Sequence, residues 1–241
     1  MTRITADKLT KITKEPKYKF KRAGTNGNLI AVVLDESGSM QPAQATTIAG
    51  FNEFVQGQRA AEHAGAAYLT LNKFDAPQIK NVFSDRPLAE VPDLTTANYM
   101  PNGGTNLLDA IGQTIHQVDA ALGARKKKDR PGVIVLIMTD GEENSSHQYN
   151  NDQIKAMVAA AEKADWSFVF LGANIDAFSV GATFGMSALN SVNYSTNNMA
   201  GTMDAMSTMT VNMRNAKLSG MSTHEVYAST TMSKEDCERI K

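Results

Sequence analysis

Three short, uninterrupted apolar runs constrain the fold of this chain more than any other feature. They span residues 29–34, 133–138 and 167–171. A strand that helices cover on both faces has no polar side, so it reads as a continuous apolar run instead of an alternating one. Helix-length amphipathic segments separate these runs, which is the pattern of βα units around a mostly parallel sheet. We therefore expect a doubly wound α/β fold with helices on both faces.

Two further segments predict an antiparallel hairpin at one edge of this sheet. Residues 66–74 and 79–84 both have strand character, and only residues 75–78 join them. A parallel crossover needs about a dozen residues or more, so these two strands must run antiparallel. With a short edge strand at 192–195, the predicted sheet has six strands, mostly parallel, with one antiparallel edge strand.

Apolar residues at three- and four-residue steps predict the helices. The clearest stripe consists of Leu108, Ile111, Ile115, Val118 and Leu122. Pro42 suits the first turn of an earlier helix that runs to about Glu62. The other predicted helices span 151–164, 176–184 and 199–218. The last of them has methionines along one face, which we expect to fill gaps in the core.

Length and composition favour one domain with polar ends. A chain of 241 residues can bury a substantial core, and its formal net charge of -1 gives no overall attraction to nucleic acid or anionic membranes. Residues 1–27 are basic and are expected to form a flexible arm. The domain is expected to span 28–218, followed by a polar C-terminal tail over 219–241.

The sequence predicts a soluble, cytoplasmic protein. The N-terminal arm has no apolar stretch of the kind found in a secretory signal. The longest apolar run, 133–138, is too short to span a bilayer, so no membrane partner is expected. The single cysteine, Cys237, cannot form a disulfide within the chain, which fits a reducing compartment.

Small polar side chains gather in three loops at the predicted carboxyl edge of the sheet. Asp35, Ser37 and Ser39 stand at alternate positions directly after the first strand, and residues 102–106 and 138–141 form the other two loops. Open α/β sheets bind their ligands at this edge. Mg²⁺ prefers oxygen ligands at octahedral corners, and an extended turn can aim alternating side chains at one point. These loops therefore predict a site for a divalent cation.

The three loops resemble those of the von Willebrand factor A (vWA) family. The metal-ion-dependent adhesion site (MIDAS) of that family has the pattern Asp-x-Ser-x-Ser, followed by a Thr and then by an Asp. In this chain the pattern is complete, with Asp35, Ser37, Ser39, Thr105 and Asp140. The resemblance covers residues 28 to about 218 and implies the Rossmann-like vWA fold.

The resemblance also implies a role for each residue of the pattern. The hydroxyls of Ser37, Ser39 and Thr105 would bind the cation directly, and the carboxylates of Asp35 and Asp140 would bind directly or through water. The expected cation is Mg²⁺, with Mn²⁺ as an alternative. A partner protein that presents an Asp or Glu would complete the coordination shell.

The function that this implies is a divalent-cation-dependent protein–protein interaction module that is not an enzyme. Intracellular members of the family suggest three settings for such a module. These are a partner of an AAA+ ATPase, a stress-response component, and a bacterial or phage accessory protein. Nucleic acid is not an expected partner on this interpretation.

Two other functions stay open at the level of the sequence. A nucleic-acid-associated protein would use the basic arm and the basic loop 125–130, and its metal site would be structural. A Mg²⁺-dependent hydrolase would use Ser37 or Ser39 as the nucleophile and His147 as the base. The sequence has no GxSxG motif, which argues against the hydrolase.

Three glutamates near the predicted site bear on the acidic partner. Glu36, Glu142 and Glu143 would repel an acidic ligand if their side chains faced the cation. Exposed charges are strongly screened by water and salt. We therefore expect all three to be solvated loop residues that point away from the site.

Overall fold

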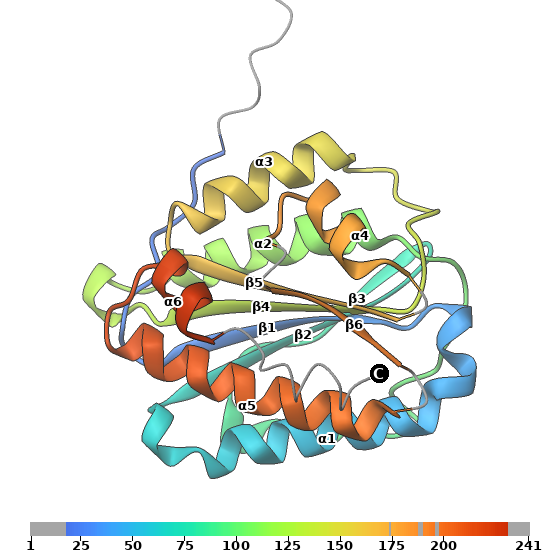
Figure 1. The fold of residues 1–241 in the computed structure, drawn as a ribbon, viewed down its shortest axis with the longest axis horizontal. Helices are drawn as coiled ribbons and strands as arrows, with labels where there is room; N and C mark the ends of the chain where they lie inside the picture. The colour runs from blue at the N-terminus through green and yellow to red at the C-terminus, as the bar shows by residue number, and fades with distance from the viewer. Residues whose placement is uncertain (1–17, 174, 188–189, 196–197, 231–241) are drawn as a thin grey trace, which may run out of the picture.

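The computed structural model describes residues 18–173, 175–187, 190–195 and 198–230. Six strands form one sheet in the order β3-β2-β1-β4-β5-β6 (Figure 1). They are β1 (Asn28–Asp35), β2 (Ala67–Asp75), β3 (Gln78–Pro87), β4 (Gly132–Thr139), β5 (Trp166–Ala173) and β6 (Ser191–Tyr194). Neighbouring strands are parallel except β2 and β3, which are antiparallel. This confirms the predicted mostly parallel sheet with one antiparallel edge strand.

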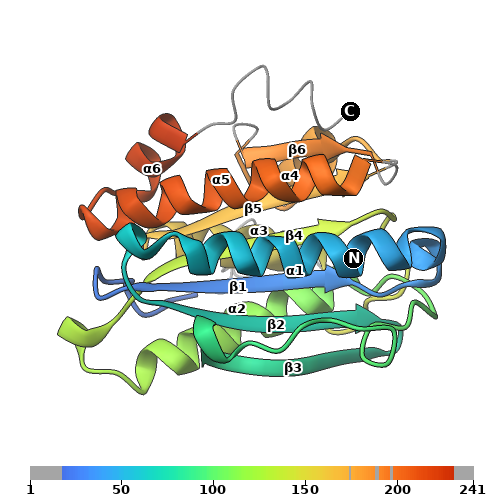
Figure 2. The same cartoon turned by 90° about the horizontal axis from the view of Figure 1, so that it is seen from below.

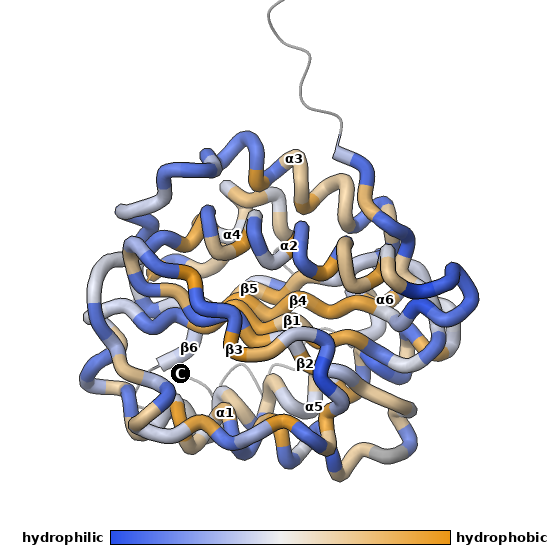
Figure 3. The backbone as a smooth tube through the Cα atoms, turned by 180° about the vertical axis from the view of Figure 1, so that it is seen from behind, coloured by the Kyte–Doolittle hydropathy of each residue, from blue (hydrophilic) through white to orange (hydrophobic). Residues whose placement is uncertain are grey.

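The three predicted apolar runs form the central strands β1, β4 and β5. Every residue in these strands is buried, and together they form the hydrophobic centre of the molecule in Figure 3. Successive side chains point to opposite faces of a sheet, so a fully apolar strand contributes to two cores at once. Ile30, Val32 and Leu34 lie in one core, and Leu29, Ala31 and Val33 lie in the other.

Helices cover both faces of the sheet, as predicted (Figures 1 and 2). One face carries α1 (Gln44–Ala60), α5 (Met199–Leu218) and α6 (Thr223–Thr230), and the other carries α2 (Leu107–Gly123), α3 (Asn151–Glu162) and α4 (Ala177–Thr183). In Figure 2, α1 and α5 lie side by side across the sheet. Pro42 lies in the short 3-10 turn η2 (Gly38–Ala43) that leads into α1. No helix among the described residues is long and apolar enough to cross a membrane.

The methionines of α5 fill the core between this helix and the sheet. Met203, Met206, Met209 and Met213 are all buried against the side chains of β1, β4 and α1. Their flexible side chains suit the irregular gap between a straight helix and a twisted sheet. The predicted core-filling role is thus confirmed for Met203, Met206 and Met213.

The N-terminal segment before β1 is more ordered than the sequence indicates. Residues 1–17 lie outside the described part of the chain, but residues 18–27 pack against the domain. The indole nitrogen of Trp166 donates to the backbone oxygen of Lys21 at 2.9 Å, and the Phe20 ring lies 5.7 Å from the Trp166 ring. The prediction of a flexible arm over 1–27 is therefore wrong for residues 18–27.

The C-terminal segment also contains structure that the sequence did not indicate. The predicted polar tail, 219–241, contains α6, and residues 231–241 lie outside the described part. Val226 and Tyr227 of α6 are buried in the core on the face of the sheet that α1 and α5 cover. The Tyr227 hydroxyl accepts a hydrogen bond from the Phe168 nitrogen at 2.8 Å and donates one to Glu162 at 2.9 Å. The domain thus includes α6, which lies beyond the predicted boundary at residue 218.

Candidate metal centre

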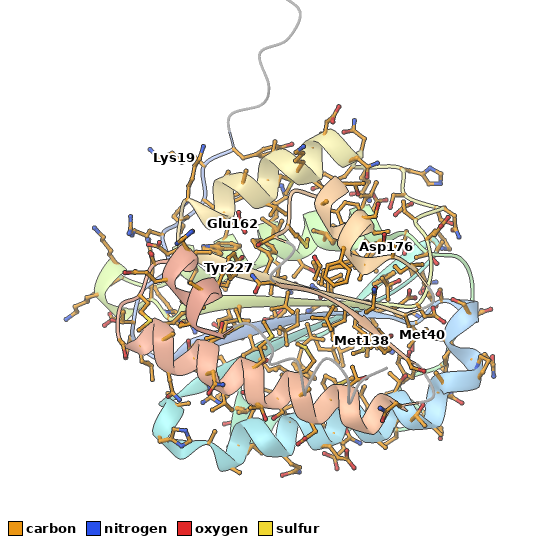
Figure 4. The ribbon with its side chains drawn as sticks, in the orientation of Figure 1. Lys19, Met40, Met138, Glu162, Asp176 and Tyr227 are labelled. Carbon is orange, nitrogen blue, oxygen red and sulfur yellow. The ribbon has the colours of Figure 1, made fainter. Side chains whose placement is uncertain are left out.

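The three predicted loops meet at one edge of the sheet, and two of them follow neighbouring parallel strands. β1 ends at Asp35 and its neighbour β4 ends at Thr139, so the loops that follow them leave the sheet side by side. Met40 and Met138, labelled at the right of Figure 4, mark this edge. The loop before α2 joins them, because the Gly38 nitrogen donates to the Gly103 oxygen at 3.1 Å. Residues from three distant parts of the chain therefore meet here.

Hydroxyl and carboxylate groups from two of these loops contact one another directly. The Ser37 and Ser39 hydroxyl oxygens lie 3.1 Å apart, and the Ser39 hydroxyl donates to the Asp140 Oδ1 at 2.6 Å. Ser37 and Asp140 are buried, whereas Ser39 is exposed. The cluster therefore opens to solvent at Ser39, where a ligand from outside has access.

Thr105 brings the third loop into the same cluster. A Cβ atom built on Gly141 would lie 3.2 Å from the Thr105 Oγ1 and 3.5 Å from the Ser39 Oγ. Both hydroxyls therefore border the backbone that directly follows Asp140. A side chain at position 141 would contact both hydroxyls and would crowd that of Thr105. The five predicted site residues are thus brought together.

Asp35 is the most deeply buried residue of the cluster, with 0% of its surface exposed. Its Oδ1 accepts a hydrogen bond from the Ser37 nitrogen at 2.7 Å, and its Oδ2 accepts one from the Thr139 hydroxyl at 2.5 Å. Burial raises the pKa of Asp35 to about 6, the hydrogen bonds from Ser37 and Thr139 oppose this rise, and the charge of Asp140 adds to it. A buried carboxylate in this state gains from a nearby positive charge.

Burial also raises the pKa of Asp140, although the hydrogen bond from Ser39 lowers it in part. Two carboxylates whose ionised forms are both disfavoured by burial stand at one site. A cation held by both carboxylates would favour their ionised forms. The electrostatics of the cluster therefore favour a bound cation.

Two further residues hold this cluster, and no role was predicted for them from the sequence. Thr139 orients the Asp35 carboxylate, and the Tyr99 hydroxyl donates to the Asp35 backbone oxygen at 2.7 Å. Thr139 directly precedes Asp140 in the sequence, so its role beside the predicted site could have been suspected from its position. Tyr99 comes from the connection before the second loop, and no local pattern links it to Asp35.

Glu36 is not the solvated loop residue that the sequence predicts. Its side chain is 1% exposed, and its Oε1 lies 2.5 Å from the Lys73 Nζ. Lys80 lies 3.5 Å from the other carboxylate oxygen, and the Met100 nitrogen donates to Oε1 at 2.6 Å. Glu36 is buried because β2 pairs with β1 so that Lys73 lies opposite Leu34, two residues before Glu36. Lysine charges therefore neutralise Glu36 inside the protein.

The other two glutamates differ from each other. Glu142 is exposed, as predicted, but Glu143 is partly buried and is not a free loop acid. Its carboxylate accepts from the Leu108 nitrogen at 2.9 Å at the start of α2 and from the Ser146 nitrogen at 2.7 Å. A carboxylate at a helix N-terminus satisfies unpaired N–H groups and complements the helix dipole. Glu143 therefore anchors the loop after β4.

A buried aspartate holds the rest of that loop. The Asp109 carboxylate accepts from the backbone nitrogens of His147, Gln148 and Tyr149, each at 2.9 Å. His147, the base of the hydrolase hypothesis, is exposed on this loop. The basic loop of the nucleic-acid hypothesis includes η5 (Lys127–Asp129) and leads to the amino end of β4, opposite the cluster.

The donor set fits a small, hard cation. It consists of two carboxylates and three hydroxyls, and Mg²⁺ and Mn²⁺ prefer such oxygen ligands. No group of three or more His, Cys, Asp or Glu side chains that could hold a metal occurs in the described part of the chain. A site for zinc of the usual nitrogen and sulfur type is therefore not found among these residues.

Comparison with known proteins identifies the fold. No protein-family model and no curated protein sequence matches the chain. The solved structure of proximal thread matrix protein 1 from the mussel byssus matches with a TM-score of 0.56 and 11% identity, over 80% of this chain and 49% of that chain. Another structure of the same mussel protein, with a zinc-occupied MIDAS motif, has a TM-score of 0.56 and 12% identity, over 79% and 49%.

Two other solved structures extend the comparison. The VWA domain of SpRpn10 matches with a TM-score of 0.51 and 8% identity, over 73% of this chain and 95% of that domain. The pilus adhesin SpaC from Lactobacillus rhamnosus GG matches with a TM-score of 0.55 and 12% identity, over 81% and 32%. This chain therefore has the vWA fold, and it spans about half the length of the mussel protein.

Proposed function

We propose that this chain is a protein-interaction module that binds an acidic side chain of its partner through a divalent cation. The proposed cation ligands are Asp35, Ser37, Ser39, Thr105 and Asp140. The observation that carries the proposal is the hydroxyl and carboxylate cluster at the carboxyl edge of the sheet, which is buried at Asp35 and open to solvent at Ser39.

The charge of the donor set supports an acidic partner. Two carboxylates balance the charge of a divalent cation, and three neutral hydroxyls add no further charge. When bound, the cation supplies an electrophilic coordination position that a carboxylate from another protein can fill. The exposure of Ser39 supports a coordination position that a partner can reach from the surface.

The surroundings of the cluster also suit an acidic partner. Glu36 is the acidic residue between Asp35 and Ser37, and its charge would weaken binding if it stood free. The Lys73 and Lys80 ammonium groups lie 2.5 and 3.5 Å from its carboxylate oxygens. Glu143 faces the N-terminus of α2. Glu36 is thus paired with lysines, and Glu143 binds the start of α2. Neither of these two glutamates therefore opposes an acidic partner.

Selection of peptides from a random library displayed on phage tests this function without knowledge of the partner. The wild-type protein is immobilised with Mg²⁺, and bound phage are eluted with EDTA. We expect each recovered peptide to contain an Asp or Glu whose change to Asn or Gln abolishes binding. A carboxylate can complete the coordination shell of the cation, and a neutral amide is a much weaker ligand.

Two serine variants provide the controls for this selection. Ser39→Ala removes a proposed ligand and is expected to lose the recovered peptides. Ser229→Ala removes an exposed hydroxyl from α6, at the opposite edge of the sheet, and should retain them. Peptides that bind equally well in EDTA, or whose acidic residues can be replaced without loss, would contradict the proposed function.

A further inference from the structure

Tyr194, at the end of the edge strand β6, lies two strands away from the end of β4, which Asp140 directly follows. Thr139, the last residue of β4, pairs with Gly172 of β5, so Asp140 follows the one strand where Ala173 continues the other. Ala173 in turn pairs with Tyr194. Ala173 and Tyr194 face the core beneath α1 and α5. Asp140 is two residues beyond Met138, which faces the same core, so strand alternation assigns Asp140 to that face as well.

The residue between Asp140 and Tyr194 is small. Neighbouring strands lie about 4.8 Å apart, so Asp140 and Tyr194 are separated by roughly two such spacings. A tyrosine side chain is long enough to cover much of that distance, and the methyl group of Ala173 leaves room for the ring to lie across it. The Tyr194 side chain can therefore extend over Ala173 toward Asp140, on the face of the sheet that α1 and α5 cover.

The Tyr194 hydroxyl is buried and has no hydrogen-bond partner among the described residues. Burial raises the pKa of Tyr194, and the charges of Asp140 and then Asp35 raise it further. Tyr99 differs, because its hydroxyl donates to the Asp35 backbone oxygen. A buried hydroxyl without a partner is costly and rarely kept in a native structure without a reason.

We propose that Tyr194 is a positioning residue for the cation site. Its hydroxyl donates a hydrogen bond to the Asp140 carboxylate, directly or through one water, when a cation is bound. The Asp140 Oδ1 already accepts from Ser39, and a carboxylate that binds a cation through one oxygen is oriented by a donor to the other. This inference rests on the proposed cation site and adds to it a residue outside the MIDAS pattern.

Calorimetric titration of Tyr194→Phe with Mn²⁺, and then with Mg²⁺, tests the inference. The substitution removes one oxygen and keeps the ring. We expect the dissociation constant for Mn²⁺ to rise about 10-fold, as is usual when a group that orients a metal ligand is lost. The thermal midpoint of the variant in EDTA should equal or exceed that of the wild type, because the deleted hydroxyl has no partner there.

Tyr227→Phe is the matched control. It also deletes a buried tyrosine hydroxyl, but that hydroxyl bonds to Phe168 and Glu162 at the opposite end of the sheet (Figure 4). This control should lower the thermal midpoint in EDTA and leave the Mn²⁺ dissociation constant unchanged. A purely structural role of Tyr194 would instead make its variant behave like this control.

The outcomes separate the two proposals. If the wild type binds neither cation at millimolar concentration, the proposed function and this inference both fail. If the wild type binds and Tyr194→Phe binds with a dissociation constant within twofold of it, the cation site stands and the role of Tyr194 is overturned. A rise of about 10-fold in Tyr194→Phe alone supports both.

Discussion

Replacing Lys73 with methionine is expected to lower the free energy of unfolding by about 3–5 kcal/mol. Lys73 and Glu36 form a buried ion pair, with side chains that are 6% and 1% exposed. Methionine matches the length of the lysine stem but leaves the Glu36 carboxylate buried, with the more distant Lys80 as its one remaining cationic partner among the described residues. Removing one partner of a buried pair is costly because the remaining charge cannot return to water. Urea denaturation followed by circular dichroism measures the loss.

Two further variants show whether the lost pair is the cause. Lys80→Met removes the partly exposed lysine that lies 3.5 Å from Glu36 and 3.0 Å from Asp75, and it should cost less than Lys73→Met because Lys80 is not buried. The double variant Lys73→Met/Glu36→Gln removes both charges of the buried pair and should recover a large part of the stability that Lys73→Met loses. A Lys73→Met protein within about 1 kcal/mol of the wild type would contradict the buried pair.

Replacing Asp109 with alanine is the second change for which we expect a large effect, a loss of about 3 kcal/mol. Asp109 is 4% exposed, and its carboxylate accepts three backbone hydrogen bonds from the loop after β4. Hydrogen bonds to a charged group contribute about 1.5–3 kcal/mol each, and part of this is regained when the freed N–H groups reach water. The same denaturation experiment measures the change.

Asp109 also bears on the candidate metal centre, because the loop it holds begins directly after Asp140. Asp152→Ala is the matched control, since it removes an exposed acid from the first turn of α3 and should cost at most about 1 kcal/mol. Asp109→Asn keeps one carbonyl oxygen and should fall between the two. Equal stability of Asp109→Ala and Asp152→Ala would show that the three hydrogen bonds do not hold the loop.

The central part of the fold could be predicted from the sequence because a strand that is buried on both faces consists of a continuous apolar run. The runs of β1, β4 and β5 can be recognised without knowing which strands lie beside them. The hairpin β2–β3 followed from the length of its link alone. These features are local, so a single sequence carries them.

The terminal segments were missed because their apolar residues are few and widely spaced. In α6 only Val226 and Tyr227 are large apolar residues that the core covers, which is too little for a periodic pattern. One local signal was present: the Ser222 nitrogen donates to the Glu225 carboxylate at 2.8 Å, and the Glu225 nitrogen donates to the Ser222 hydroxyl at 3.4 Å. This is a capping box, and its Ser-x-x-Glu spacing can be read from the sequence.

In the candidate site, the residues on the loops could be predicted and the residues behind them could not. Asp35, Ser37 and Ser39 follow one strand at fixed spacing, whereas Lys73 reaches Glu36 only because β2 pairs with β1. Tyr194 likewise reaches the site through its register with β5. Contacts that depend on strand order and register have no signature in a single sequence.

Thermal unfolding in EDTA and in Mg²⁺ or Mn²⁺ tests the proposed cation site most directly. A ligand that binds only the folded state adds about 2.7 kcal/mol at a concentration 100 times its dissociation constant. The thermal midpoint of the wild type should therefore rise with either cation and return with EDTA, while Asp35→Ala and Ser39→Ala should show little or no rise. An unchanged wild-type midpoint at millimolar cation, or an equal rise in all three proteins, would contradict a cation site at these residues.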